Sequence, residues 1–300
     1  MVTQLKDLST WANMKNLQPE NMTPLLVMLA QGPFIAEDIF PAVPSTDAFQ
    51  WETEDSNDKF TVARKRGERG GATLNDFTTS KLTAEAYEYF EGAQITAKAL
   101  RSGNIYSFVN LTVRKMEMIA SKIRMNIEKD LLAAMQDRTT YATINYHSCS
   151  VNFLTRGTSD PIKDFSLAVN KIRGTEHVEA DVIILGGTDK TNMTLSDNIR
   201  DTQQYTKDYT TEGLVYERVN GLQLYTSTAV YKSGTSYISI LSGQAVIMKR
   251  GIAGELKEAE AYLADSDFNK GNKVLTLYGS RVIKPVVIRP KAICLVANVS

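Results

Sequence analysis

The longest periodic pattern in the chain runs from about residue 104 to 138, where mostly apolar residues recur at gaps of three and four. They are Ile105, Phe108, Thr112, Met116, Ile119, Ile123, Ile127, Leu131 and Met135. This spacing places them on one face of a helix of about thirty residues, roughly 45–50 Å long at 1.5 Å per residue. Charged residues occupy the other face, so we predict a long amphipathic helix that lies along another element.

Two segments in which apolar and polar residues alternate precede this helix and flank a polar stretch. Phe49 and Trp51 alternate with polar neighbours, as do the apolar residues of "TSKLTAEAYEYF" at 79–90. Alternation predicts β-strands, and two such segments in succession predict a long hairpin. Its tip would be the stretch 58–77, "DKFTVARKRGERGGATLNDF", which carries Lys59, Arg64, Lys65, Arg66 and Arg69.

Prolines divide the first part of the chain into short pieces. We predict a helix from about Pro24 to Ala30 with Thr23 as its N-cap, because proline is favoured at the first helical position. The segment "FIAEDIFPAVPS" then follows an extended path, since Pro41 and Pro44 restrict the backbone around them.

The second half of the chain alternates between predicted helices and apolar strands. A helix is expected after Ser159 or Asp160 as N-cap, with Pro161 at its start and Gly174 at its end. "ADVIILGG" at 180–187 is a continuous apolar run, which is typical of a strand buried on both faces. A short helix at about Thr191–Ile199 follows it.

More strands complete the chain, with turns predicted at Asn220-Gly221 and Ser233-Gly234. The final segment, "KVLTLYGSRVIKPVVIRPKAICLVANV", predicts two strand runs split by Gly279. Together these patterns indicate an α+β protein, in which the closing strands pack back on the long helix.

The amino-acid composition argues against several classes of function. Lysine and arginine number 34, as do aspartate and glutamate, so the formal net charge is zero and the basic excess of a DNA-wrapping protein is missing. The most apolar early stretch, "TPLLVMLAQGPF", is too short to span a bilayer. Two cysteines are too few for a disulfide framework and suit a reducing compartment. We therefore expect a soluble, intracellular protein with no membrane contact.

Candidate catalytic and metal-binding residues are few. His147 and Cys149 would share one face of a strand and could in principle form a zinc site with His177 and Cys294. They lack the closely spaced pairs of zinc motifs, so we predict buried strand cysteines and exposed histidines instead. No "GxSxG" motif is present, and the carboxylates show no concentrated pair.

The stretch "ILGGTDKTN" resembles a phosphate-binding loop only superficially. Asp189 stands immediately before Lys190, where its charge would repel phosphate. A strand-to-helix turn capped by threonine or asparagine explains the stretch better. We predict no catalytic residue, no metal site and no cofactor.

The basic stretch at 58–77 has three possible interpretations. Contact with nucleic acid would need aromatic residues around the arginines, and only Phe60 and Phe77 are present. A solvated loop without a partner is the second reading. We favour a third, in which Lys59, Arg64, Lys65, Arg66 and Arg69 contact carboxylates of another subunit.

Taken in order, these pieces resemble the major capsid protein of tailed double-stranded DNA bacteriophages, which has the Hong Kong 97-like capsid fold. The strings that carry the resemblance are "IAEDIFPAVP", "DKFTVARKRG", "ADVIILGGTDK" and "RPKAICLV". The resemblance implies an N-terminal arm, an extended loop, a peripheral domain with the long helix, an axial domain, and closing strands of the peripheral domain. Their expected ranges are 1–48, 49–92, 93–156, 157–250 and 251–300.

The resemblance also implies a function, which is assembly rather than catalysis. Subunits would form pentamers and hexamers of an icosahedral shell that encloses double-stranded DNA. Assembly would take place in the host cytoplasm, and the protein would end in the virion. Scaffolding, portal and decoration proteins are further expected partners.

Some members of the family form a lysine–asparagine cross-link between subunits. In this sequence, Lys59 or Lys65 with Asn298 are conceivable partners, although no motif selects them.

Encapsulins use the same fold to build a compartment around an enzyme, and this is the alternative function. A soluble α+β enzyme is the third hypothesis.

Overall fold

The computed structural model describes the chain in nine segments. They are 19–30, 35–54, 79–96, 105–155, 157–199, 218–227, 230–233, 236–269 and 274–299. The helices are α2 (Pro19–Ala30), α3 (Ile35–Ile39), α5 (Ile105–Gln136), α6 (Pro161–Glu176), α7 (Gly187–Thr194) and the 3-10 turn η3 (Pro290–Ala292). Among the described helices, none is both long and apolar enough to cross a membrane.

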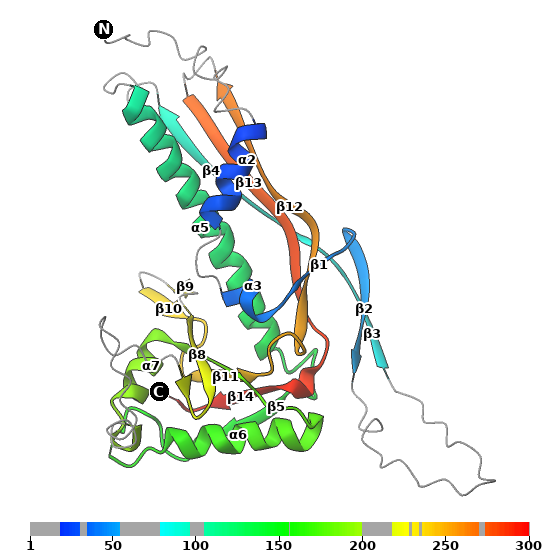
Figure 1. Cartoon of the computed structure of the whole chain (residues 1–300), viewed down its shortest axis with the longest axis vertical. Coiled ribbons are helices and arrows are strands. Elements are labelled where there is room, and N and C mark those ends of the chain that lie inside the picture. The colour runs from blue at the N-terminus through cyan, green and yellow to red at the C-terminus, as the bar shows by residue number, and fades with distance from the viewer. Residues whose placement is uncertain are drawn as a thin grey trace, which may run out of the picture.

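The strands form two larger sheets and two two-stranded ribbons (Figure 1). In chain order they are β1 (Ala42–Pro44), β2 (Ala48–Glu54), β3 (Thr79–Glu85), β4 (Tyr87–Thr96), β5 (Asn145–Ser148), β6 (Val182–Gly186), β7 (Arg218–Val219), β8 (Leu222–Ser227), β9 (Val230–Ser233), β10 (Ser236–Ser239), β11 (Gln244–Met248), β12 (Gly254–Asn269), β13 (Val274–Val287) and β14 (Ile293–Ala297).

The long helix predicted from the apolar pattern is confirmed. Helix α5 has 32 residues and lies along the sheet β1-β12-β13-β4 (Figure 1). Its predicted apolar face is buried, with Met116, Ile119, Ile123, Ile127, Leu131 and Met135 at most 1% exposed. Helix α2 packs on the same side of the sheet, so one face of the sheet is covered by two helices.

Strand β13 continues through Gly279, so the predicted break at this glycine is wrong. A Cβ atom at Gly279 would lie 2.7 Å from Cγ2 of Ile119 and 3.0 Å from Cδ2 of Leu26. The glycine therefore allows α5 and α2 to approach the strand closely. The chain leaves the sheet instead at η3, where Pro290 begins a turn before β14.

The six-stranded sheet has the order β5-β14-β11-β6-β8-β7 and is buried on both faces. Its alternate residues Ile183 and Ile247 pack with the apolar side of α6, while Ile184 and Val246 belong to the core that includes α5. Burial on both faces explains the continuous apolar run predicted as β6. The final segment contributes to both sheets, since β14 belongs to this one.

Several helix boundaries differ from the predictions. Helix α2 begins at Pro19, and Thr23 lies inside it, where its hydroxyl accepts a hydrogen bond from the Ala264 N–H instead of capping the helix. Helix α6 is capped by Asp160 as predicted, but it continues through Gly174 to Glu176, and the following residue, His177, is its C-cap with a φ of 54°. Helix α7 begins at Gly187, ahead of the predicted start.

The turn predicted at Asn220-Gly221 is confirmed. Its φ values are 53° and 79°, and it joins the antiparallel strands β7 and β8. The second predicted turn includes Gly234, which is outside the described residues, although the flanking strands β9 and β10 do pair as a hairpin.

Candidate assembly surfaces

A two-stranded hairpin projects away from both sheets (Figure 1). Strands β2 and β3 pair antiparallel, with Trp51 opposite Leu82, as the alternating pattern predicts. Midway along β2, the Trp51 indole N–H donates a hydrogen bond to the Val287 carbonyl oxygen at 3.2 Å, and Phe49 and Thr53 on the same face of the strand are buried. An isolated two-stranded hairpin is only marginally stable in water, so the exposed remainder of this hairpin is suited to contact another surface.

The predicted contact residues at the tip of this hairpin lie outside the described residues. They are Lys59, Arg64, Lys65, Arg66 and Arg69, all between 55 and 78. Their role in contacts between subunits therefore stays a prediction.

The face of the four-stranded sheet that points away from α5 is exposed and partly apolar. Phe90 of β4 is 58% exposed and stacks on Tyr278 of β13, with ring centroids 5.3 Å apart. Leu263 of β12 is 51% exposed, and the register places it in the row of Phe90. The exposed carboxylates Asp265 and Asp267 follow on the same face of β12. We name these five residues the outer patch.

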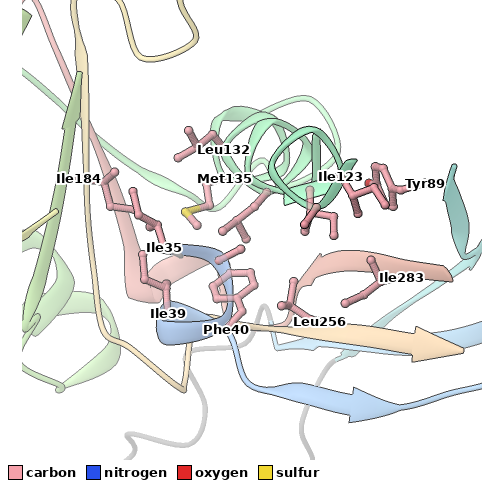
Figure 2. Close-up of a cluster of buried hydrophobic side chains, with 14 of the residues drawn as sticks. Ile35, Ile39, Phe40, Tyr89, Ile123, Leu132, Met135, Ile184, Leu256 and Ile283 are labelled. Atoms are coloured by element: carbon pink, nitrogen blue, oxygen red, sulfur yellow. The ribbon is translucent and has the colours of Figure 1, made fainter. Parts of the chain in front are cut away.

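Helix α3 and the residue after it form an apolar wedge between the two sheets. Figure 2 shows Ile39 and Phe40 lying between Ile184 of the six-stranded sheet and Leu256 of the four-stranded sheet. A Cβ atom at Gly254 would lie 2.4 Å from Cε2 of Phe40, so a glycine is required where the phenyl ring contacts β12. One continuous core therefore joins the two sheets.

Two successive carboxylates of α3 each bind a different sheet. Glu37 pairs with the Arg281 guanidinium of β13, which also donates from Nε to Oε1 of Glu258 at 2.8 Å. Asp38 lies 3.6 Å from the Arg250 guanidinium, next to the six-stranded sheet. Since Arg281 is only 4% exposed, its two carboxylate partners are needed to compensate for its buried charge.

Buried tyrosine hydroxyls lie between α5, α3 and the four-stranded sheet. Burial raises the pKa of Tyr89, whose hydroxyl donates a hydrogen bond to Oδ2 of Asp130 at 2.6 Å. Burial also raises the pKa of Tyr262, against whose ring the Arg281 guanidinium packs at 4.6 Å. Both groups stay neutral at physiological pH and act in packing.

The zinc candidates do not converge. Nε2 of His147 lies in hydrogen-bond contact with Oδ1 of Asp164 near the start of α6, at 3.1 Å, whereas His177 directly follows the end of that helix. Thirteen residues of helix separate these positions by about 20 Å. Cys149 and Cys294 are buried as predicted, but His147 is not exposed, which corrects that part of the prediction. In the described part of the chain, no three potential ligands gather around a metal position.

Burial also makes both thiols unreactive. It raises the pKa of Cys149 and of Cys294 to about 12, and the nearby Asp164 carboxylate contributes further at Cys149. A thiol with such a pKa is almost entirely protonated at neutral pH and is a poor nucleophile.

The start of α7 is built differently from a phosphate-binding loop. The Asp189 side chain is 3% exposed, and its Oδ2 would lie 3.2 Å from a Cβ atom at Gly186, the N-cap residue. The carboxylate therefore occupies the position where an anion would bind. The predicted threonine or asparagine cap is wrong, since Gly186 provides no side-chain cap.

Asn298 lies at the end of β14, away from the outer patch. Its φ is 61°, and its side-chain N–H donates a hydrogen bond to the Cys149 carbonyl oxygen at 3.0 Å. The amide thus joins β14 to the residue after β5. Lys59 and Lys65 lie outside the described residues, so the cross-link stays a prediction.

A shallow hollow of about 270 Å³ lies between α6 and the β7–β8 turn. Its lining includes Ser166, Asn220 and the ion pair of Arg173 with Glu179, and contains no histidine or cysteine. These residues bond to one another and do not form a nucleophile–base pair.

Comparison with solved structures finds the same architecture at low sequence identity. A phage-related protein from Bordetella bronchiseptica RB50 gives a TM-score of 0.66 at 15% identity, over 92% of this chain and 96% of that one. The virus-like particle from Pyrococcus furiosus gives 0.58 at 9% identity, over 92% and 98%. The mature capsid of bacteriophage PhiM1 gives 0.58 at 10% identity, over 89% of each chain.

No protein-family model matches the chain, and no curated protein matches it in sequence. The structural likeness shows that the chain has the Hong Kong 97-like capsid fold, which is the α+β fold expected from the sequence.

Proposed function

We propose that this chain is a self-assembling shell protein, the major capsid protein of a tailed bacteriophage. Copies of it would form pentamers and hexamers of an icosahedral shell around double-stranded DNA. The observation that carries the proposal is the projecting hairpin β2–β3, which pairs with no third strand among the described residues and is joined to β13 midway along β2 by the hydrogen bond of Trp51. Such an element gains stability when a neighbouring subunit packs against it.

The outer patch supplies a surface for the hairpin tip of a neighbouring copy. Its centre is apolar, through Phe90, Leu263 and Tyr278, and its margin carries the carboxylates of Asp265 and Asp267. The predicted tip carries five lysines and arginines between residues 59 and 69. Opposite charges at the margin would fix the register of the contact, while the apolar centre supplies burial.

The five ranges expected for the subunit are retained as proposed domains, with adjustments that follow the two sheets. β4 and β12–β13 belong to the four-stranded sheet, whereas β5 and β14 belong to the six-stranded sheet. We therefore assign 87–96 and 254–287 to the peripheral domain, and β5 and β14 to the axial domain. The ion pairs of α3 with both sheets would hold these domains at a fixed angle.

The proposed role is structural rather than catalytic, and the virion is the proposed location. Scaffolding, portal and decoration proteins remain proposed partners. An encapsulin-type shell is the second candidate, favoured by the likeness to a structure whose name is a virus-like particle. The content of the particles distinguishes the two functions.

Negative-stain electron microscopy of the full chain after size exclusion tests the proposal. We expect closed shells, tubes or capsomer rings, and nuclease-protected DNA inside particles recovered from infected or packaging-competent cells. A stable small oligomer, unchanged by deletion of 56–76 and not assembled by any added partner, would contradict it.

Charge reversal sharpens this test. The combined substitutions Arg64→Glu, Lys65→Glu and Arg66→Glu should block assembly, and Asp265→Lys with Asp267→Lys should restore it in the same chain. Reversal of an exposed carboxylate on α5, such as that of Glu117, is the matched control and should neither block nor rescue. An assembly yield that neither set of charge reversals changes would refute the proposed contact.

A further inference from the structure

The side of α5 that points away from the four-stranded sheet carries a regular row of lysines and methionines. We name this row the Lys–Met face; its members are Lys115, Met118, Lys122, Met125 and Lys129. The gaps between successive members alternate between three and four residues, so all five lie within an arc of about 80° on the helix. The buried residues Ile119 and Ile123 lie on the other side, against the sheet.

The two methionines form an apolar line along this face. Met118 is 38% exposed and Met125 is 39% exposed. They are one heptad apart, which places them about 10.5 Å from each other on the same side of the helix. Methionine side chains adapt to the shape of what they contact and are frequent on surfaces that bind other proteins. A line of this kind is suited to an apolar partner.

The three lysines give the apolar line a positive border. Lys122 pairs with Glu91 of β4, whereas no described residue forms an ion pair with Lys115 or Lys129. The lysines are also one heptad apart, so the positive charges repeat every 10.5 Å or so over about 21 Å of helix. An acidic partner of similar length would match this repeat.

The carboxylates of α5 do not neutralise the Lys–Met face. Glu117 lies about 120° around the helix from the middle of the face. Glu128 is buried and accepts a hydrogen bond from the Ser227 hydroxyl at 2.7 Å. Asp130 accepts a hydrogen bond from the Tyr89 hydroxyl on the sheet side. The positive charge of the face is therefore not balanced within its own helix.

A hollow of about 240 Å³ lies at the C-terminal end of the face. Ala133 follows Lys129 by one helical turn and lines this hollow together with Ala134 and Pro285. The lining also includes charged residues of both signs. Because the side chains from α5 are small at this point, the hollow leaves room for a large side chain of another molecule.

We propose that the Lys–Met face binds an acidic amphipathic helix of a partner protein. Alternating gaps of three and four residues are the spacing at which two helices pack side by side, with the side chains of one between those of the other. The apolar residues of the partner helix would lie on the two methionines, and its last large apolar side chain would enter the hollow. Its flanking carboxylates would pair with the three lysines.

Other occupants fit this face less well. Duplex DNA would use the lysines alone, since its phosphates are bound by charge, and would leave the methionine line without a partner. A second copy of α5 would place lysines opposite lysines. The first 18 residues of the chain contain Lys6 and Lys15 but only one acidic residue, Asp7, so they lack the complementary charge.

The inference goes beyond the proposed shell function, because it concerns a contact that one subunit makes with a helix of another protein. Fluorescence anisotropy tests it with the full chain, as subunits or capsomers, and labelled peptides of about 20 residues, which span the face as a helix. The acidic peptide has leucines at alternating gaps of three and four with glutamates beside them. Lysine replaces every glutamate in a second peptide, and glutamine replaces every leucine in a third.

We expect the acidic peptide to bind at least about tenfold more tightly than either of the other two. Met118→Ser combined with Met125→Ser should weaken its binding by about tenfold or more. Met28→Ser is the matched control, because Met28 is 61% exposed on α2 and is not part of the face, and it should leave binding unchanged.

Charge reversal tests the lysines separately. Lys115→Glu combined with Lys129→Glu should shift the preference of the chain from the acidic to the basic peptide. Lys163→Glu, at an exposed position of α6, is the matched control and should not change the preference. If the serine variants do not fold, this reversal at surface positions decides alone.

Three results would overturn the inference. They are no binding of the acidic peptide, equal binding of all three peptides, and binding of a DNA duplex of about 20 base pairs that is as tight and is insensitive to the methionine substitutions. Shells formed by a chain that binds no acidic peptide would leave the proposed function standing. A chain that binds the acidic peptide as expected but forms no shells would overturn that function and leave this inference standing.

Discussion

Two glycines of this chain should respond in opposite directions to the addition of one methyl group. Gly279 lies in β13 beneath α5, where a Cβ atom would be 2.7 Å from Cγ2 of Ile119 and 3.0 Å from Cδ2 of Leu26. Carbon atoms normally pack at about 3.5–4.0 Å, so α5 or these side chains must shift. Gly174 lies on the exposed side of α6 with no atom within 4 Å of its Cβ position.

The magnitudes follow from these distances. Overpacking a core costs about 1–3 kcal/mol, and the smaller backbone entropy of alanine in the unfolded chain offsets roughly 0.5–1 kcal/mol of this. We therefore expect Gly279→Ala to lower the free energy of unfolding by about 1 kcal/mol, and by about 2.5 kcal/mol if α5 cannot shift. Gly174→Ala meets no neighbour and gains the better helix propensity of alanine, so it should raise that free energy by about 0.5–1 kcal/mol.

Urea unfolding of the unassembled chain, followed by far-ultraviolet circular dichroism, measures both changes. A double-mutant cycle with Ile119→Ala adds a direct test of the contact, because it removes the methyl group that the new Cβ atom in Gly279→Ala would meet. In the Ile119→Ala background, Gly279→Ala should cost about 1 kcal/mol less than in the wild type. The reasoning is refuted if Gly279→Ala is as stable as the wild type, or if the cycle shows no coupling.

Three substitutions and one measurement of thiol reactivity test the packing of the subunit. Arg281→Met leaves two partly buried carboxylates unpaired and should destabilise the chain by about 3 kcal/mol in urea unfolding; a loss below about 1 kcal/mol would mean that the ion pairs are solvated. Trp51→Phe removes the hydrogen bond that joins the middle of β2 to Val287. It should cost about 1 kcal/mol and speed exchange of the β2 and β3 amides; unchanged exchange would contradict this contact. Asp160→Ala removes the N-cap of α6 and should cost about 1 kcal/mol, measured by thermal unfolding, with Asp160→Asn as the near-neutral control. Burial raises the pKa of Cys149 and Cys294 to about 12, from an ordinary value near 9. The stability that the neutral thiols contribute is therefore complete below about pH 9 and is lost as the pH rises toward 12. Reaction of the thiols with a disulfide reagent at pH 8 should require unfolding, and rapid reaction of the folded chain would disprove their burial.

The local patterns of the sequence were sufficient for the elements that carry the fold. The three- and four-residue spacing located α5, alternation located both strands of the hairpin, and the continuous apolar run located β6. Each of these signals comes from neighbours in the chain, because a face is defined by residues one turn or two positions apart. The resemblance of the ordered pieces then pointed to the capsid fold before any tertiary contact was known.

Other elements could not be recognised from local pattern. Strand β12 is 16 residues long but reads "GELKEAEAYLADSDFN", a charged sequence whose strand identity depends on pairing with β13. His147 lacks any local signal for its hydrogen bond with Asp164, which comes from a different element 17 positions away.

The sequence by itself determined which segments are helical or extended and which of their faces are apolar. Only the tertiary structure decided what the two glycines do: Gly174 was expected to end a helix and Gly279 to split a strand, yet both elements continue. The physical reason is that the missing Cβ of a glycine can serve either of two purposes. It allows backbone dihedral angles that other residues avoid, or it leaves space for another element to pack closely. The choice between them depends on whether another element, here α5 against β13, comes within contact distance.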